Sequence, residues 1–197
     1  MIVIGLTGSI GMGKSTLASQ LAALGAKISN ADDIVHRLLG KGGAAVKAVA
    51  KQFPGVAENG AVNRKALGDI VFRDKAKLRA LERILHPLVV EAEIAFVRKQ
   101  QRLGAALVAL DIPLLFETGA DERCDLTLVA TAPFFIQRQR VLARPNMTEE
   151  KFREILRSQL PDCEKRARAD VVVRTGLGKA ASFRACKALV MTIRVSA

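Results

Sequence analysis

The sequence of 197 residues predicts an α/β fold in which a parallel sheet is covered by helices and a helical segment is inserted after the second strand. Three observations predict it. Short apolar runs alternate with segments of helical periodicity, and a glycine-rich turn joins the first apolar run to the first helix. The run Ala105–Leu110 is apolar without interruption, as expected of a strand that is buried on both faces. The length suits one sizeable core.

The order of the expected elements defines a core and an insertion. Strands are expected at Ile2–Leu6, Ala26–Ser29, Ala105–Leu110, Leu126–Ala130 and Asp170–Val173, and helices at Ser15–Leu24, Pro133–Ala143, Thr148–Gln159 and Gly178–Ile193. Between Ala31 and Arg102 no segment has the pattern of a core strand, and Asn63 is placed to cap a helix. A further helix carries the apolar stripe Leu85, Leu88, Val89, Ala92 and Phe96. We therefore expect a core of residues 1–30 and 105–197 and an inserted helical domain of residues 31–104.

Composition restricts the classes of partner. The formal net charge of +12 suits an anionic partner such as nucleic acid, acidic lipid or a polyphosphate. The chain lacks Tyr and Trp, and so has few of the aromatic residues that stack on single-stranded nucleic acid. No apolar run approaches the roughly 20 residues needed to cross a bilayer, and no signal-peptide pattern is present. The three cysteines are scattered, which favours a reducing compartment. We expect a cytoplasmic protein without a membrane span, and the charge alone does not decide which anionic partner it binds.

The segment GSIGMGKS at residues 8–15 matches the phosphate-binding pattern G-x-x-x-x-G-K-[ST] between an expected strand and an expected helix. Glycines allow backbone N–H groups to approach phosphate oxygens, and a helix N-terminus favours negative charge. The nucleotide-binding residues expected here are Gly11, Met12, Gly13, Lys14, Ser15 and Thr16. Lys14 would contact the β- and γ-phosphates, and the Ser15 hydroxyl would bind Mg²⁺. The loop alone does not distinguish a switch, a motor and a small-molecule kinase, but no guanine-binding N-K-x-D motif is present, which weighs against a GTPase.

Two acidic residues follow expected strands at the sheet edge where ligands of parallel sheets bind. Asp32 either accepts the proton of an attacking hydroxyl or caps the helix that runs to Leu39, and both interpretations are open on the sequence alone. Asp111 ends the strand 105–110, and a Mg²⁺-binding role is favoured over that of a turn residue.

Basic residues provide further candidates. Arg138, Arg140 and Arg144 precede a basic helix, and guanidinium groups bind phosphate through paired donors. His86 precedes Pro87, and the alternative to a ligand is a structural residue at a helix end.

With these residues in view, the chain resembles the dephospho-coenzyme A kinases almost end to end. The segments that carry the resemblance are NADDIVHRLL, VNRKALGDIVF, LERILHPLV, DIPLLFETG, QRQRVLAR and RSQLPDCEKRARADVVV, in addition to the phosphate-binding loop. The resemblance implies a three-layer P-loop NTPase fold with a five-stranded parallel sheet and helices on both faces. Residues 1–30 and 105–197 would form the nucleotide-binding core, residues 144–168 a helical lid, and residues 31–104 the acceptor-binding insertion for coenzyme A.

The resemblance also implies a reaction and assigns residues to it. The reaction is ATP-dependent phosphorylation of the 3′-hydroxyl of the ribose of dephospho-coenzyme A, with Mg²⁺, giving coenzyme A and ADP as the last step of coenzyme A biosynthesis. Asp32, rather than Asp33, would be the base, and Arg140 would move with the lid onto the transferred phosphoryl group. The remaining implied roles are Arg144 near the nucleotide base, Arg64, His86 and Leu114 in acceptor-binding segments, and Asp111 as the acid at the strand end. The partners implied are ATP and dephospho-coenzyme A. We expect no nucleic-acid partner and no membrane partner, and we expect the enzyme to be a monomer.

Two positions depart from the family pattern. Asn30 stands where the first Asp of a D-A-D motif is usual, which keeps an acceptor oxygen and loses a charge. Thr175 stands where an Asn before the last helix is common, which leaves open how adenine is recognised.

Two other functions are compatible with parts of the sequence. One is a P-loop kinase for another hydroxyl, of a nucleoside, nucleotide or sugar. The other is a nucleotide-dependent nucleic-acid-binding protein, suggested by the net charge of +12.

Overall fold

The fold of the chain is given by a computed structural model that describes residues 1–71 and 74–196. Contacts within the chain divide it into two compact units. One unit comprises Met1–Ser29 and Lys99–Ala197, and the other comprises Asn30–Arg98. Within the described ranges, no helix is both long enough and apolar enough to span a membrane.

The first unit is built on a five-stranded sheet with the strand order β2-β5-β1-β6-β7. Its strands are β1 (Ile2–Thr7), β2 (Lys27–Asn30), β5 (Leu107–Asp111), β6 (Leu126–Thr131) and β7 (Val171–Arg174). The pairings of β1 with β5, β1 with β6 and β6 with β7 are parallel. Each strand lies where the sequence predicts one, and the predicted five-stranded α/β fold is confirmed.

The helices of this unit are α1 (Lys14–Ala23), α6 (Phe134–Leu142), α7 (Glu149–Ser158), α8 (Asp162–Arg168) and α9 (Lys179–Ser196). Short 3₁₀ helices follow at η1 (Ala120–Arg123) and η2 (Thr175–Leu177). Sequence periodicity predicts all the longer helices except α8. Helix α8 has no apolar stripe, because its single buried residue is Lys165. Periodicity of apolar residues therefore cannot indicate this helix.

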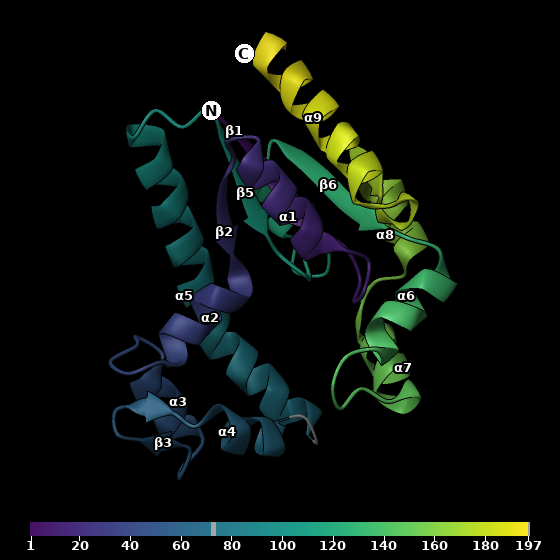
Figure 1. The fold of residues 1–197 in the computed structure, drawn as a ribbon. Helices are drawn as coiled ribbons and strands as arrows, with labels where there is room; N and C mark the ends of the chain where they lie inside the picture. The colour runs from purple at the N-terminus through teal and green to yellow at the C-terminus, as the bar shows by residue number, and fades with distance from the viewer. Residues whose placement is uncertain (72–73, 197) are drawn as a thin grey trace. The chain divides into compact units, whose positions relative to one another are not determined.

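Side chains that alternate along β1 are covered on both faces of the sheet. Ile4 and Leu6 are fully buried in a cluster with residues of α1 and α9, which pack against each other in Figure 1. A Cβ built on the intervening Gly5 would lie 2.8 Å from Sγ of Cys124 and 3.0 Å from a methyl group of Leu115. Because both faces are occupied, the central strands read as continuous apolar runs in the sequence.

A polar pair joins the start of β6 to the start of β7. The Thr127 hydroxyl donates to Oδ2 of Asp170 at 2.6 Å, and the Thr127 backbone N–H donates to the same oxygen at 2.8 Å. These two bonds hold the pKa of the Asp170 carboxyl below its ordinary value. They pair the two strands in register at the edge of the sheet.

The second unit is mainly helical. It contains α2 (Ala31–Leu39), α3 (Val46–Gln52), a hairpin of β3 (Ala57–Glu58) and β4 (Ala61–Val62), α4 (Arg64–Val71) and most of α5 (Lys75–Arg102). Its core is an apolar cluster formed by Leu39, Ala45, Val46, Val49, Phe53, Val56, Val62, Leu67, Val71 and Leu81. The predicted cap of α4 is confirmed, since Oδ1 of Asn63 accepts the N–H of Ala66 at 3.1 Å.

The interpretation of His86 as a residue at a helix end is wrong. Helix α5 continues through Pro87, with His86 exposed in its interior. Proline removes one backbone donor and disfavours the helical conformation of the preceding residue. Leu85 and Leu88, on either side of the pair, pack against the core of the second unit, and this packing outweighs the local preference.

Candidate active site

The phosphate-binding loop has the backbone that its glycines predict. Gly11 and Gly13 have φ values of 76° and 89°, in the left-handed region that favours glycine. A Cβ on Gly11 would lie 2.5 Å from Cγ2 of Val141, and a Cβ on Gly13 would lie 2.9 Å from Oγ1 of Thr175. The loop therefore has no room for side chains at these positions. It leads directly into the N-terminus of α1, an arrangement that binds phosphate through backbone N–H groups.

Lys14 and Asp111, predicted separately, lie together. Lys14 is the first residue of α1, and Asp111 is the last residue of β5, in register with Leu6 of β1. Nζ of Lys14 is 2.5 Å from Oδ1 of Asp111, whose side chain is 1% exposed. The exposed Ser15 follows Lys14. A hydroxyl and a carboxylate are oxygen donors of the kind that Mg²⁺ prefers, so these residues fit the expected metal.

Helix α6 is fixed to the phosphate-binding loop. Nε2 of the buried Gln137 donates to the carbonyl oxygen of Ile10 at 2.8 Å. Nη1 of Arg140 donates to the Gly11 carbonyl at 3.4 Å, and Nη2 donates to the Thr175 carbonyl at 2.9 Å. Arg140 therefore lies on a helix that is held against the loop. That Arg140 moves with the lid stays a prediction.

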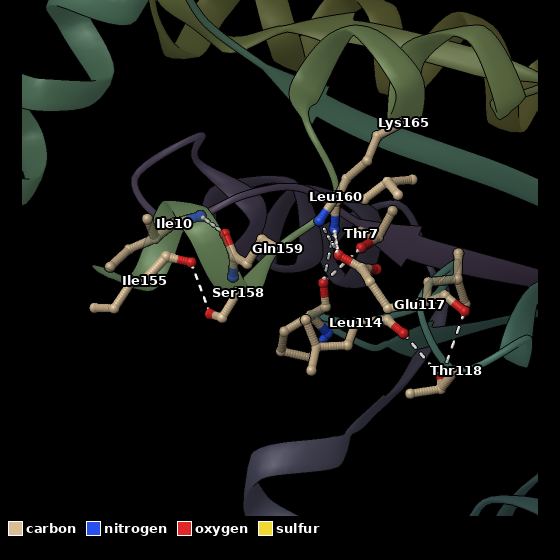
Figure 2. A network of polar contacts seen from close by, with 12 residues as sticks. Thr7, Ile10, Leu114, Glu117, Thr118, Ile155, Ser158, Gln159, Leu160 and Lys165 are labelled. Carbon is tan, nitrogen blue, oxygen red and sulfur yellow. Dashed lines mark hydrogen bonds and ion pairs between the residues drawn. The ribbon is translucent and has the colours of Figure 1, made fainter. Parts of the chain in front are cut away.

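A buried ion pair holds the segment that follows β5 (Figure 2). Nζ of Lys165 lies 2.8 Å from Oε1 of Glu117 and donates to the carbonyl of Pro113 at 3.2 Å, and the Lys165 side chain is 0% exposed. The Thr7 hydroxyl, at the end of β1, donates to the same Pro113 carbonyl at 3.1 Å. The backbone of DIPLLFE is thus fixed directly after Asp111.

The end of α7 is bonded to the same region and to the phosphate-binding loop (Figure 2). The backbone N–H of Leu160 donates to Oε1 of Glu117 at 2.7 Å. The neighbouring Gln159 accepts the backbone N–H of Ile10 on its Oε1 at 3.0 Å. Because the Ile10 carbonyl also accepts from Gln137 of α6, side chains of α6 and of the α7–α8 connection both bond the backbone of this one loop residue.

The second unit carries Asp32, and the structure shows which residue caps α2. Asn30 is the N-cap of α2, with its Oδ1 accepting the N–H groups of Asp32 at 2.8 Å and Asp33 at 3.2 Å. Asp32 therefore does not cap the helix, and its side chain is exposed in the first turn. The replacement of an Asp by Asn30 is compatible with the cap, because Asn and Asp serve equally well there.

Arg64 is paired with a histidine that the sequence analysis did not single out. Nη1 of Arg64, the first residue of α4, lies 2.6 Å from Nδ1 of His36 on α2. An arginine only donates, so Nδ1 of His36 accepts, and the imidazole proton is on Nε2. His36 is four residues after Asp32, a spacing that places both on the same face of α2. That spacing is the signal by which His36 could have been found.

The other predicted residues are located as follows. Leu114 is half-buried, and its carbonyl accepts the Thr118 hydroxyl at 2.8 Å. Arg144 is exposed two residues after the end of α6. Thr16 lies in the first turn of α1.

Comparison with known proteins identifies the family. The family model described as dephospho-CoA kinase matches residues 2–178. The chain belongs to the dephospho-CoA kinase family. The dephospho-CoA kinase of Brucella abortus is 52% identical over 175 residues, 89% of this chain and 86% of the relative. The dephospho-CoA kinase of Mesorhizobium japonicum is 48% identical over 194 residues, 98% of each chain. A solved structure, TT1252 from Thermus thermophilus, is 36% identical with a TM-score of 0.82 and covers 97% of both chains.

Membership of the dephospho-CoA kinase family makes the chain a kinase, a transferase that phosphorylates an alcohol group, with the three-layer α/β fold of P-loop kinases. The sequence alone does not single out the polar side chains that hold the phosphate-binding loop and the segment after β5. These are Gln137, Gln159, Glu117 and Lys165. Each of these four residues lies in a segment that resembles the family. No residue spacing in the sequence shows which partner the side chain contacts.

Proposed function

We propose that this chain transfers the γ-phosphoryl group of ATP to the 3′-hydroxyl of the ribose of dephospho-CoA, giving CoA and ADP. In this reaction the bond from the acceptor oxygen to the γ-phosphorus forms, the bond from the γ-phosphorus to the β,γ-bridging oxygen breaks, and the hydroxyl proton is released to a base. The observation that carries the proposal is the phosphate-binding loop with Lys14 beside Asp111 in a chain of the dephospho-CoA kinase family.

The donor phosphates are proposed to bind to the loop. Backbone N–H groups of residues 11–16 would hold the phosphate oxygens, with Lys14 on the β- and γ-phosphates. Arg140 would neutralise charge that develops on the transferred group, since it is held against Gly11 of the loop. Arg144 is proposed to lie near the nucleotide base.

Mg²⁺ is the proposed cofactor. Ser15 and Asp111 would hold it, because together they offer a hydroxyl and a buried carboxylate next to Lys14. Bound with ATP, Mg²⁺ would supply neutralisation of phosphate charge.

Asp32 is proposed as the base. Its carboxylate is exposed in the first turn of α2 and is not used as a helix cap, so it is available to orient the 3′-hydroxyl and accept its proton. A loose transition state needs little proton transfer before the new bond forms, so an ordinary carboxylate suffices.

Residues 31–104 are proposed to bind the acceptor, with Arg64 and His86 contributing, and Leu114 is proposed as a further acceptor-binding residue. The acceptor carries a pyrophosphate, and a guanidinium that already donates one bond to His36 has four N–H donors left for it. We also propose that the enzyme acts as a monomer in the cytoplasm. Its three cysteines are free, as is usual in a reducing compartment.

The proposal is tested by the acceptor dependence of ADP release. A coupled assay would compare dephospho-CoA with adenosine, AMP and a sugar as acceptors, while DNA and RNA binding is titrated in parallel at several salt concentrations. The expected result is ADP release that depends on dephospho-CoA. A preference for another acceptor would indicate a kinase of different specificity, and steeply salt-dependent nucleic-acid binding without acceptor-dependent ADP release would indicate a binding protein.

Substitution of Arg64 is expected to weaken acceptor binding specifically. Arg64→Ala removes a charge-assisted donor and should raise KM for dephospho-CoA about tenfold, with KM for ATP and kcat changed less than about threefold. His36→Ala should raise the same KM by about threefold, because Arg64 then loses its orienting bond. Lys65→Ala is the matched control, as Lys65 is also exposed in the first turn of α4. An Arg64→Ala enzyme with the KM of the Lys65→Ala control would contradict the assignment.

A further inference from the structure

We infer that the Thr175 hydroxyl is a positioning group that holds Arg140 and the phosphate-binding loop in a fixed relation. The inference rests on the proposed role of Arg140 in phosphoryl transfer. Thr175 begins η2, directly after β7, and its side chain is buried with 5% exposure.

The hydroxyl forms a hydrogen-bond chain with one possible direction. Nη1 of Arg140 lies 3.0 Å from Oγ1 of Thr175, and Oγ1 lies 2.6 Å from the carbonyl oxygen of Met12. A guanidinium has only donors, so Oγ1 accepts from Arg140 and donates its one proton to a carbonyl. The Met12 carbonyl at 2.6 Å is the nearer acceptor, and the Thr131 carbonyl lies at 3.3 Å. Bonds aligned in this way polarise one another, and the donor end is charged. The chain therefore links the guanidinium to the loop peptide that lies two residues before Lys14.

Arg140 contacts the same residue a second time. Its Nη2 donates to the Thr175 backbone carbonyl at 2.9 Å, and its Nη1 also approaches the Gly11 carbonyl at 3.4 Å. Two donors on the hydroxyl and carbonyl of one residue fix both the position and the plane of the guanidinium. The backbone bond survives any substitution at position 175, so the hydroxyl is the part of this arrangement that can be removed alone.

Packing fixes the hydroxyl in turn. Gly13 adopts a φ of 89°, and a Cβ there would lie 2.9 Å from Oγ1 and 3.0 Å from Cβ of Thr175. The Thr175 side chain thus fills the space beside the glycine. A β-branched side chain has a restricted χ1, so the hydroxyl is held in one orientation at little further entropic cost. These observations favour a positioning role over a water-exposed, exchangeable contact.

The test is a set of substitutions at position 175. Thr175→Val keeps the shape and removes the hydroxyl, and should lower kcat about tenfold while KM for dephospho-CoA stays within about twofold. Thr175→Ser keeps the donor and acceptor and should retain kcat within about threefold of the unmodified enzyme. Thr175→Ala, measured beside them, carries the same expectation as Thr175→Val if the valine variant does not fold. Thr127→Val is the matched control, since it also removes a buried, bonded hydroxyl, at the start of β6, and should lower thermal stability without lowering kcat.

Two further variants, Arg140→Ala and the double variant Arg140→Ala with Thr175→Val, show whether a failed result concerns the role of Thr175 or the proposed role of Arg140. Arg140→Ala should lower kcat at least about 100-fold, and adding Thr175→Val to it should change kcat less than about twofold. Normal kcat in Thr175→Val and Thr175→Ala beside an impaired Arg140→Ala would overturn the inference and leave the role of Arg140 standing. Normal kcat in Arg140→Ala would overturn both. A full, independent loss from Thr175→Val in the Arg140→Ala background would also overturn the inference, because the hydroxyl would then act by another route.

Discussion

Asp32→Asn is expected to lower kcat at least about 100-fold while ATP binding is retained, because the amide has the shape of the carboxylate but cannot take the hydroxyl proton. The helix should be unaffected, since the residue that caps α2 is Asn30 and the bond that it accepts is from the Asp32 backbone N–H. The measurements are steady-state kinetics with dephospho-CoA and the dissociation constant for ATP.

Asp33→Asn provides the matched control for this substitution. Asp33 is the next residue, is also exposed in the first turn of α2, and also donates its backbone N–H to Oδ1 of Asn30. It should keep kcat within about twofold of the unmodified enzyme. Turnover near normal in Asp32→Asn, or an equal loss in both variants, would contradict the assignment of the base to Asp32.

Lys165→Met is expected to lower the free energy of unfolding by about 3 kcal/mol, which corresponds to a drop of about 9 °C in Tm for a chain of this size. Methionine fills a similar volume but leaves the Glu117 carboxylate with the Leu160 N–H and without its ammonium partner. The Pro113 carbonyl also loses a donor. Thermal and denaturant unfolding monitored by circular dichroism measure the effect.

Two further variants show whether the effect comes from the ion pair. Lys187→Met makes the same change at an exposed position of α9 and should shift Tm by no more than about 1 °C. A double variant, Lys165→Met with Glu117→Leu, should be more stable than Lys165→Met alone, because it no longer buries an unpaired carboxylate. A Lys165→Met protein as stable as the Lys187→Met control would contradict a stabilising role for the pair.

The sheet and the phosphate-binding loop could be predicted because their signals are local. An uninterrupted apolar run such as the one ending at Leu110 has few alternatives to a buried strand, and the spacing of Gly11, Gly13 and Lys14 satisfies a geometric need within eight residues. The position of Asp111 at the end of a strand could be predicted in the same way, but its ion pair with Lys14 joins two separately predicted residues and is known only from the structure.

The polar framework around the loop could not be predicted because its signals are tertiary. Lys165 reads as one more surface charge in a basic segment, and only its partner Glu117, 48 positions earlier, makes it a core residue. Thr175 and Arg140 are likewise 35 residues apart. His86-Pro87 is the opposite case, in which a strong local preference for a helix end is overridden by the packing of Leu85 and Leu88.

Asn30 shows how a departure from a family pattern can be read in physical terms. As a change from Asp to Asn it suggests a weakened site, because a charge is lost beside the proposed base. The hydrogen bonds to Asp32 and Asp33 show that the side chain works as a helix cap, for which the charge is not required. The departure therefore leaves Asp32 as the carboxylate on which the proposed chemistry depends.

The most direct test of the central claim is the identity of the phosphorylated product. The enzyme would be incubated with ATP, Mg²⁺ and dephospho-CoA, ADP would be quantified, and the acceptor would be examined by mass spectrometry and ³¹P NMR. We predict one new phosphomonoester on the 3′-oxygen of the ribose for each ADP released. ADP release without a phosphorylated acceptor, or a phosphate on another oxygen, would contradict the proposed function.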